Sequence, residues 1–189
     1  VENHISDLAD TLEFRHMGYR LCARFWSSAR APARACVLIA HGMGEHSGRY
    51  QPIAQVLNNA GYHVLAPDLR GHGQSRPAYC EPGDMGYEGW QRSVLDLRSL
   101  QQWLTDNYAL PVILIGHSMG AMLAQQYLGY FGSNLAACLL SGSTGALPAV
   151  TTLSGELLAS LDSLRLGPHA PSPMPVSYTH LTLPTMMSV

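Results

Sequence analysis

PVILIGHSMG, the stretch from Pro111 to Gly120, decides the fold of this chain. Its aliphatic run from Val112 to Ile115 predicts a buried strand, and the pattern after Gly120 becomes helical. A strand therefore passes through a sharp turn into a helix, with Ser118 on the turn. In a G-x-S-x-G elbow this geometry holds the serine hydroxyl above the sheet edge, where a substrate carbonyl can reach it.

The glycines on either side of the serine support the same interpretation. We expect side chains at Gly116 and Gly120 to collide where the helix folds back against the strand, so glycine leaves the space that the turn needs. The pentapeptide alone is a weak signal because glycine and serine are common residues. The strand before it and the helix after it make the signal much stronger.

Strand and helix patterns alternate along the chain. Continuous apolar runs at 35–40 and 135–140 are typical of strands covered on both faces, like the run before Ser118, and residues 62–66 predict a further buried strand. Helical spacing falls between the strands, at Ile53, Val56, Leu57 and Ala60, at Trp90, Val94, Leu97, Leu100 and Leu104, and at Met119, Met122, Leu123, Tyr127 and Tyr130. This alternation predicts an α/β fold with a mostly parallel sheet and helices on both faces. Residues 12–14 and 19–26 predict a hairpin that adds an antiparallel extension.

The composition excludes several classes of protein. Eleven Lys and Arg residues against 13 Asp and Glu residues give a net charge of −2, so nothing in the chain is built to bind nucleic acid. No apolar run has the length of a membrane span, and the first residues lack the layout of a signal peptide. Cys22, Cys36, Cys80 and Cys138 have no C-x-x-C spacing, so we expect reduced thiols and a cytoplasmic protein.

Glycine-rich loops follow three of the expected parallel strands: HGMGEHSGRY at 41–50, DLRGHGQS at 68–75 and GHSMG at 116–120. Ligands of open α/β sheets bind at this carboxyl edge. Together the three loops resemble the α/β-hydrolase family, and within it the monoglyceride lipase and lysophospholipase group of serine hydrolases. HGMGEHSGRY is the most specific of the three, with Met43 at the variable position. The resemblance runs from about residue 12 to residue 164.

The resemblance implies a role for each matching residue. Ser118 is the expected nucleophile. The backbone N–H groups of Met43 and Met119 are the expected oxyanion donors, which act because they are fixed in place before charge develops. Elbow and loop shaping is expected from His41, Gly42, Gly116, His117 and Gly120. No metal and no organic cofactor is implied.

Four histidines, His41, His46, His72 and His117, are expected near this site. No H-x-x-x-H pair on one helix face accompanies a third ligand, so we expect no zinc site. We expect His41 and His117 to shape their loops through hydrogen bonds rather than to carry protons.

Two pairs of charged residues are expected to hold the loops. Asp68 with Arg70 is interpreted as electrostatic anchoring of the second loop, in agreement with the resemblance. Glu45 is expected to pair with Arg49 and to stiffen the first loop, without a catalytic role.

The residues after the serine depart from the family pattern. The family places an acid and then a histidine after the nucleophile, each following a later strand. The acids available here are Glu156 and Asp162, and the histidines are His169 and His180. Asp162 falls in an amphipathic helix expected at 153–164. We therefore expect the triad acid and histidine to be missing from this chain, and the chain by itself to be inactive.

The expected organisation has three parts. Residues 1–145 form an incomplete α/β-hydrolase core, residues 146–167 begin a lid, and residues 168–189 form a disordered or non-native tail. Within the tail, PMPVSYTHLTLP at 173–184 resembles translated adapter sequence, so we expect this chain to be a fragment. The apolar run at 135–140 would then form an uncovered sheet edge and lower the solubility.

Several functions remain open at this point. We expect a serine ester hydrolase that acts on monoacylglycerols or lysophospholipids through an acylated Ser118. The alternative enzyme is a general carboxylesterase or an acyl-peptide-type hydrolase of the same fold, since a fold alone does not fix the substrate. The alternative outside enzymes is a binding protein that lost the triad. The expected partners are a small lipid ester and a membrane surface touched by the lid, and the oligomeric state is left open.

Overall fold

A six-stranded sheet runs through residues 9–143, the part of the chain that this computed structural model describes. The chain divides into two units, Val1–Ser141 and Gly142–Val189, and all the elements below belong to the first. The expectations for the lid, the tail and the helix at 153–164 fall outside the described residues.

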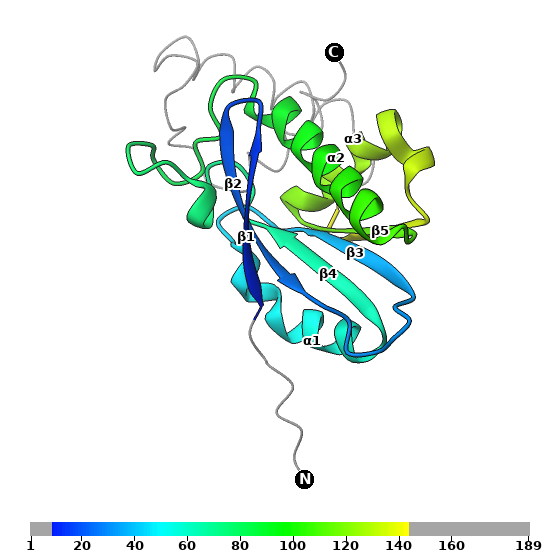
Figure 1. The fold of residues 1–189 in the computed structure, drawn as a ribbon. Helices are drawn as coiled ribbons and strands as arrows, with labels where there is room; N and C mark the ends of the chain where they lie inside the picture. Colours follow the sequence, from blue (N-terminus) through cyan, green and yellow to red (C-terminus); the bar gives the residue numbers. More distant parts are fainter. Residues whose placement is uncertain (1–8, 144–189) are drawn as a thin grey trace. The chain divides into compact units, whose positions relative to one another are not determined.

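The strands lie in the order β1-β2-β4-β3-β5-β6 (Figure 1). Their bounds are β1 Asp10–His16, β2 Tyr19–Trp26, β3 Ala35–Ala40, β4 Tyr62–Pro67, β5 Val112–His117 and β6 Ala137–Ser141. Strands β4, β3, β5 and β6 pair in parallel, whereas β1 and β2 form an antiparallel hairpin that joins β4. The predicted mostly parallel sheet with an antiparallel extension is confirmed.

Within residues 9–143, three α-helices cover the sheet: α1 Gln51–Asn59, α2 Gly89–Tyr108 and α3 Met119–Phe131. Short 3-10 turns lie at Ser47–Tyr50, Gly73–Ser75 and Gly132–Asn134. Helix α1 lies on one face of the sheet, and α2 and α3 lie together on the other (Figure 1). None of the helices in this described part is long and apolar enough to cross a membrane.

The core follows the predicted helix periodicity on one face of the sheet more closely than on the other. All five predicted apolar positions of α2 are buried, and so are four of the five in α3; Tyr130 is 64% exposed. In α1 the expected face is only partly right: Leu57 packs against the core, but Ile53 and Val56 are exposed and Ala54 is the buried residue. Ala54 packs into a cluster with Val37 of β3, so the helix presents its smallest side chain to the sheet.

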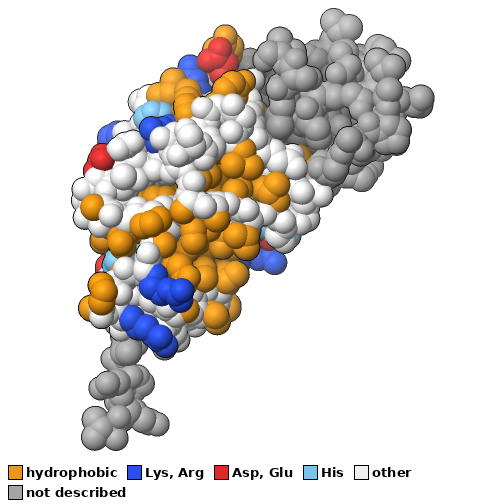
Figure 2. Space-filling view, turned by 90° about the vertical axis from the view of Figure 1, so that its right-hand side faces the viewer, with side chains coloured by type: hydrophobic (Ala, Val, Ile, Leu, Met, Phe, Trp, Pro, Cys, Tyr) orange, Lys and Arg blue, Asp and Glu red, His pale blue; other side chains and the backbone are white. Residues whose placement is uncertain are grey.

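Strand β6 is the outer strand of the described sheet. It pairs with β5, and its Leu139 and Leu140 are exposed although the sequence is continuously apolar. Figure 2 shows hydrophobic side chains gathered on the side of the molecule that lies at the right of Figure 1. An exposed apolar edge of this kind invites pairing with other chains.

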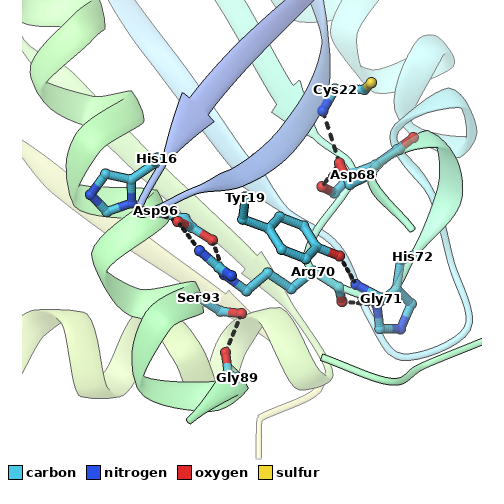
Figure 3. Close-up of polar contacts among 11 residues, drawn as sticks. His16, Tyr19, Cys22, Asp68, Arg70, Gly71, His72, Gly89, Ser93 and Asp96 are labelled. Atoms are coloured by element: carbon cyan, nitrogen blue, oxygen red, sulfur yellow. Dashed lines mark hydrogen bonds and ion pairs between the residues drawn. The ribbon is translucent and has the colours of Figure 1, made fainter. Parts of the chain in front are cut away.

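A buried ion pair joins α2 to the loop after β4. The Arg70 guanidinium donates to both carboxylate oxygens of Asp96, at 2.6 and 3.0 Å, and both side chains are buried. His16 of β1 contacts the same carboxylate at 2.7 Å, and Arg70 stacks on the Tyr19 ring at 4.2 Å (Figure 3). The Tyr19 hydroxyl in turn accepts the Gly71 amide. The hairpin, this loop and α2 are thus fastened by one polar cluster.

Replacing Arg70 by Met should therefore lower the free energy of unfolding by about 3–5 kcal/mol, because Asp96 would remain buried with both guanidinium hydrogen bonds lost and only the His16 contact left. The control is Arg15→Met, since Arg15 is largely exposed and meets Glu13 only at 3.6 Å. That change should cost less than about 1 kcal/mol. Urea unfolding of both variants measures the difference, and equal losses would contradict this account of the cluster.

Candidate active site

Ser118 stands on the turn between β5 and α3 with φ +51° and ψ −116°. A left-handed φ is strained for a residue with a side chain. Hydrogen bonds hold the turn: the Ser118 amide donates to Ser141 of β6 at 2.8 Å, and its carbonyl accepts the Ala121 amide at 2.9 Å. The side chain itself is half-buried, so it is not sealed in the core.

Glycine is required on both sides of this turn for lack of space. A methyl group at Gly116 would lie 2.4 Å from the Gly120 carbonyl oxygen, and one at Gly120 would lie 2.0 Å from the Ala40 oxygen. The first turn of α3 therefore lies directly against the end of β3. Because the loop at 41–50 leaves β3 at that point, the loop is brought to Ser118.

The loop after β3 contacts the serine through Gly42. A methyl group at Gly42 would lie 3.3 Å from the Ser118 Cβ. Met43, the next residue, is half-buried, and Met119 is fully buried as the first residue of α3. Amides in the first turn of a helix have no partner within the helix, and the helix dipole favours negative charge there. Of the two expected oxyanion residues, Met119 thus directly follows Ser118, and Met43 directly follows Gly42, the residue that lies against the serine side chain.

Glu45 fastens the loop at 41–50 from within. Its Oε2 accepts the Gly42 amide at 2.9 Å and the Tyr50 hydroxyl at 2.7 Å, and its Oε1 lies 3.2 Å from Arg49. Burial alone would raise the pKa of this carboxyl, but the hydrogen bonds from Tyr50 and Gly42, and then the charge of Arg49, lower the pKa on balance. Glu45 therefore stays ionised and holds the loop by charge-assisted hydrogen bonds.

His41 is fully buried and uses both ring nitrogens. Its Nδ1 lies 2.7 Å from the Gly42 carbonyl oxygen, and its Nε2 accepts the Leu69 amide at 2.9 Å. Burial lowers the pKa of His41 to about 4, although the bond to Gly42 opposes this effect. The imidazole is neutral at pH 7 and joins the first loop to the second.

The other three histidines do not share a partner in the described contacts. His72 is buried with its ring 5.2 Å from that of His41, and its Nδ1 bonds the Arg70 carbonyl. The His117 Nδ1 lies 3.2 Å from the Ser141 hydroxyl, and His46 is exposed. Within residues 9–143 no three His, Cys, Asp or Glu side chains are grouped so as to hold a metal ion.

Asp68 and Arg70 act on different partners. Asp68 accepts the Ser47 amide at 2.6 Å and the Gln74 amide at 2.7 Å, so it ties the first loop to the second. Arg70 bonds to Asp96 of α2. Both residues thus anchor the second loop electrostatically, as expected, and each does so through its own partner. Sequence reasoning missed Asp96, because it stands in no motif; its only signal was an acid placed among the apolar positions of α2.

Most of the sequence matches known proteins. The family model described as serine aminopeptidase, S33 (Hydrolase_4) covers residues 31–169. The chain belongs to this family. Over 158 residues it is 34% identical to the monoglyceride lipase of Homo sapiens, which covers 80% of this chain and 50% of that protein. A monoacylglycerol lipase of Mycolicibacterium smegmatis is 34% identical over 139 residues, 73% of this chain and 46% of that protein. This Hydrolase_4 chain thus spans about half the length of these curated relatives.

Solved structures agree with the fold. A thermostable carboxyl esterase from Bacillus coagulans, in complex with glycerol, matches with a TM-score of 0.75 and 29% identity over 92% of this chain and 55% of that one. A monoglyceride lipase variant from Saccharomyces cerevisiae matches with a TM-score of 0.66 at 20% identity, covering 84% of this chain and 53% of that one. The predicted α/β-hydrolase fold and the resemblance to monoglyceride lipases are confirmed.

The buried His41 predicts how stability depends on pH. The unfolded imidazole takes up a proton near pH 6.5, whereas the folded one does so only near pH 4, so the unfolded state binds more protons between these values. The free energy of unfolding should therefore fall by about 3 kcal/mol as the pH drops through this window. His41→Asn should lose this part of the pH dependence. Urea titrations at several pH values measure it, and identical slopes in both proteins would contradict the prediction.

The tight contact at Gly120 predicts a large difference between two Gly→Ala changes in α3. Gly120→Ala should lower the free energy of unfolding by about 3 kcal/mol or more, because its methyl group meets backbone that cannot move aside. Gly129→Ala is the matched control, since nothing lies within 4 Å of that methyl group. It should raise stability by about 0.5–1 kcal/mol through helix propensity. A tolerated Gly120→Ala would show that α3 does not lie against β3 as described.

Proposed function

We propose that this chain carries the nucleophile and the oxyanion donors of a serine hydrolase that cleaves carboxylic esters of lipids, with monoacylglycerols as the preferred substrates. The observation that carries the proposal is the approach of Gly42 to Ser118, which brings the loop at 41–50 to a serine held on a strained turn. The relatives named as monoglyceride and monoacylglycerol lipases support the substrate class.

The reaction would proceed in two steps. The Ser118 hydroxyl attacks the ester carbonyl and gives its proton to a base, and the carbonyl oxygen becomes an anion. The amides of Met43 and Met119 donate hydrogen bonds to this oxygen, the alcohol leaves, and water then hydrolyses the acylated serine. No step requires a metal or an organic cofactor. Removal of one such donor typically costs on the order of a hundredfold in rate.

The base and its orienting acid are proposed to come from residues beyond this sequence. The chain supplies only Glu156, Asp162, His169 and His180 after the serine, and the sequence pattern before them does not predict the later strands that the family places before its acid and its histidine. We therefore propose that the 189-residue chain binds ester but does not turn it over. The lid expected from residue 146 onward is proposed to admit substrate from a membrane surface in the cytoplasm.

A general carboxylesterase is the second candidate. It is favoured by the carboxyl esterase from Bacillus coagulans, whose structure matches with a TM-score of 0.75. The two candidates differ in substrate: a lipase of this kind prefers a long-chain monoacylglycerol, and a carboxylesterase prefers a short-chain ester such as 4-nitrophenyl acetate. Comparing kcat/KM for the two substrates, in a version of the protein extended to include the later strands, decides between them.

Ser118→Ala tests the proposal in a version of the protein extended to include the later strands. The variant should lose ester hydrolysis by at least about a thousandfold because the nucleophile is gone. Its circular dichroism spectrum and urea midpoint should match those of the parent, since the side chain is half-buried at a loop. Ser27→Ala, at an exposed position after β2, is the matched control and should retain turnover. Hydrolysis that survives in Ser118→Ala would remove Ser118 from the mechanism.

The extended and the 189-residue proteins should be compared in the same assay. Hydrolysis by the extended protein alone supports the assignment of base and acid to later residues. Hydrolysis by the 189-residue chain would overturn that assignment, and binding of ester without hydrolysis by both would favour a binding protein.

A further inference from the structure

The peptide between Gly42 and Met43 is held by its carbonyl oxygen. This oxygen lies 2.7 Å from the His41 Nδ1 and 3.3 Å from the Glu45 amide nitrogen. A trans peptide is planar, and its C=O and N–H bonds point in opposite directions. Whatever group fixes the direction of the Gly42 carbonyl therefore also fixes the direction of the Met43 amide.

The hydrogen bond from the Leu69 amide shows which ring nitrogen of His41 carries the proton. The Leu69 amide donates to Nε2 at 2.9 Å, so Nε2 carries no proton. A neutral imidazole then carries its proton on Nδ1, from where it donates to the Gly42 carbonyl. The low pKa of the buried ring agrees with the neutral form. Leu69 thus selects the tautomer that His41 needs in order to hold Gly42.

We propose that His41 is a positioning residue: its Nδ1–H group, selected by the Leu69 amide, sets the direction in which the Met43 amide points. The inference rests on the proposed function, in which that amide stabilises the oxyanion. Donors of this kind act because they are oriented before charge develops. A loop that left the Gly42–Met43 peptide free to turn would lose this preorganisation.

The carboxylates of Glu45 and Asp68 act on other peptides of the loop, and the Glu45 amide is a weaker second donor to the same carbonyl. Glu45 accepts the Gly42 amide and so fixes the preceding peptide, between His41 and Gly42. The Glu45 amide reaches the Gly42 carbonyl only at 3.3 Å, against 2.7 Å for the imidazole. Asp68 holds the far end of the loop at Ser47. His41 makes the shortest of these bonds to the carbonyl that shares a plane with the Met43 amide.

Two substitutions at His41 separate its two hydrogen bonds. Asparagine places an amide nitrogen near the position of Nδ1, so His41→Asn keeps a donor for Gly42 and loses the bond to Leu69. Glutamine places a carbonyl oxygen near Nε2, so His41→Gln keeps the bond to Leu69 and loses the donor. Crystal structures of both variants should show the Gly42 carbonyl unchanged in the asparagine variant and rotated in the glutamine variant. An unrotated carbonyl in His41→Gln would overturn the proposal.

A reactivity test uses Ser118→Cys, because a thiolate needs no base. With 4-nitrophenyl acetate the sulfur forms a bond to the carbonyl carbon and 4-nitrophenolate leaves, through an oxyanion. With iodoacetamide the sulfur displaces iodide and no oxyanion forms. The ratio of the two rates thus reports the oxyanion donors alone. The parent chain with Ser118 gives the background from its other cysteines, of which Cys36 is buried with its pKa raised to about 11.

Adding His41→Gln to Ser118→Cys should lower the ratio by about tenfold or more. Adding His41→Asn instead, which keeps the donor, should leave at least about a third of the ratio measured for Ser118→Cys alone. A ratio that is unchanged in His41→Gln, or equally low in both variants, would overturn the positioning role. If the ratio for Ser118→Cys alone is no higher than that of a free thiol, the proposed oxyanion site itself fails. The direction of the Gly42 carbonyl in the two crystal structures then still decides the role of His41.

Discussion

The contact between the first turn of α3 and the end of β3 sets the rest of the site. Gly120 lies so close to the Ala40 carbonyl that even one methyl group would not fit. Since α3 begins at Met119 and the loop at 41–50 begins directly after β3, this single steric constraint places the turn that bears Ser118 beside Gly42. The strained dihedral angles of the serine are a consequence of the same approach, because the chain has little length in which to reverse.

The loop at 68–75 acts as the support for the loop that contacts the serine. Its Leu69 amide and Asp68 carboxylate bond His41 and Ser47, at the two ends of the first loop. It is itself tied to α2 through the buried pair of Arg70 and Asp96 (Figure 3). Buried polar groups are costly unless satisfied, so each of these bonds also fixes a unique arrangement of the backbone.

Local patterns in the sequence were enough to predict the elements, and the elbow with its two flanking loops. The strand before Ser118 and the apolar period of α2 depend only on neighbouring residues, which is why they were found. The buried face of α1 was predicted only in part: Leu57 packs on the core, but the small Ala54, rather than the larger Ile53, is the residue buried against β3. The partner of Arg70 was missed because an ion pair across 26 residues leaves no local period. Contacts of this kind depend on the folded topology.

The hydrogen bond from the Ser118 amide to Ser141 couples the reactive turn to the outer strand of the described sheet. Strand β6 is exposed along most of its length, and exposed edge strands open locally more easily than core strands. An opening of β6 that reached Ser141 would expose the serine amide to solvent exchange while the centre of the sheet remained intact. Whatever covers or stiffens the rim of the sheet therefore also governs how long the serine keeps its strained geometry.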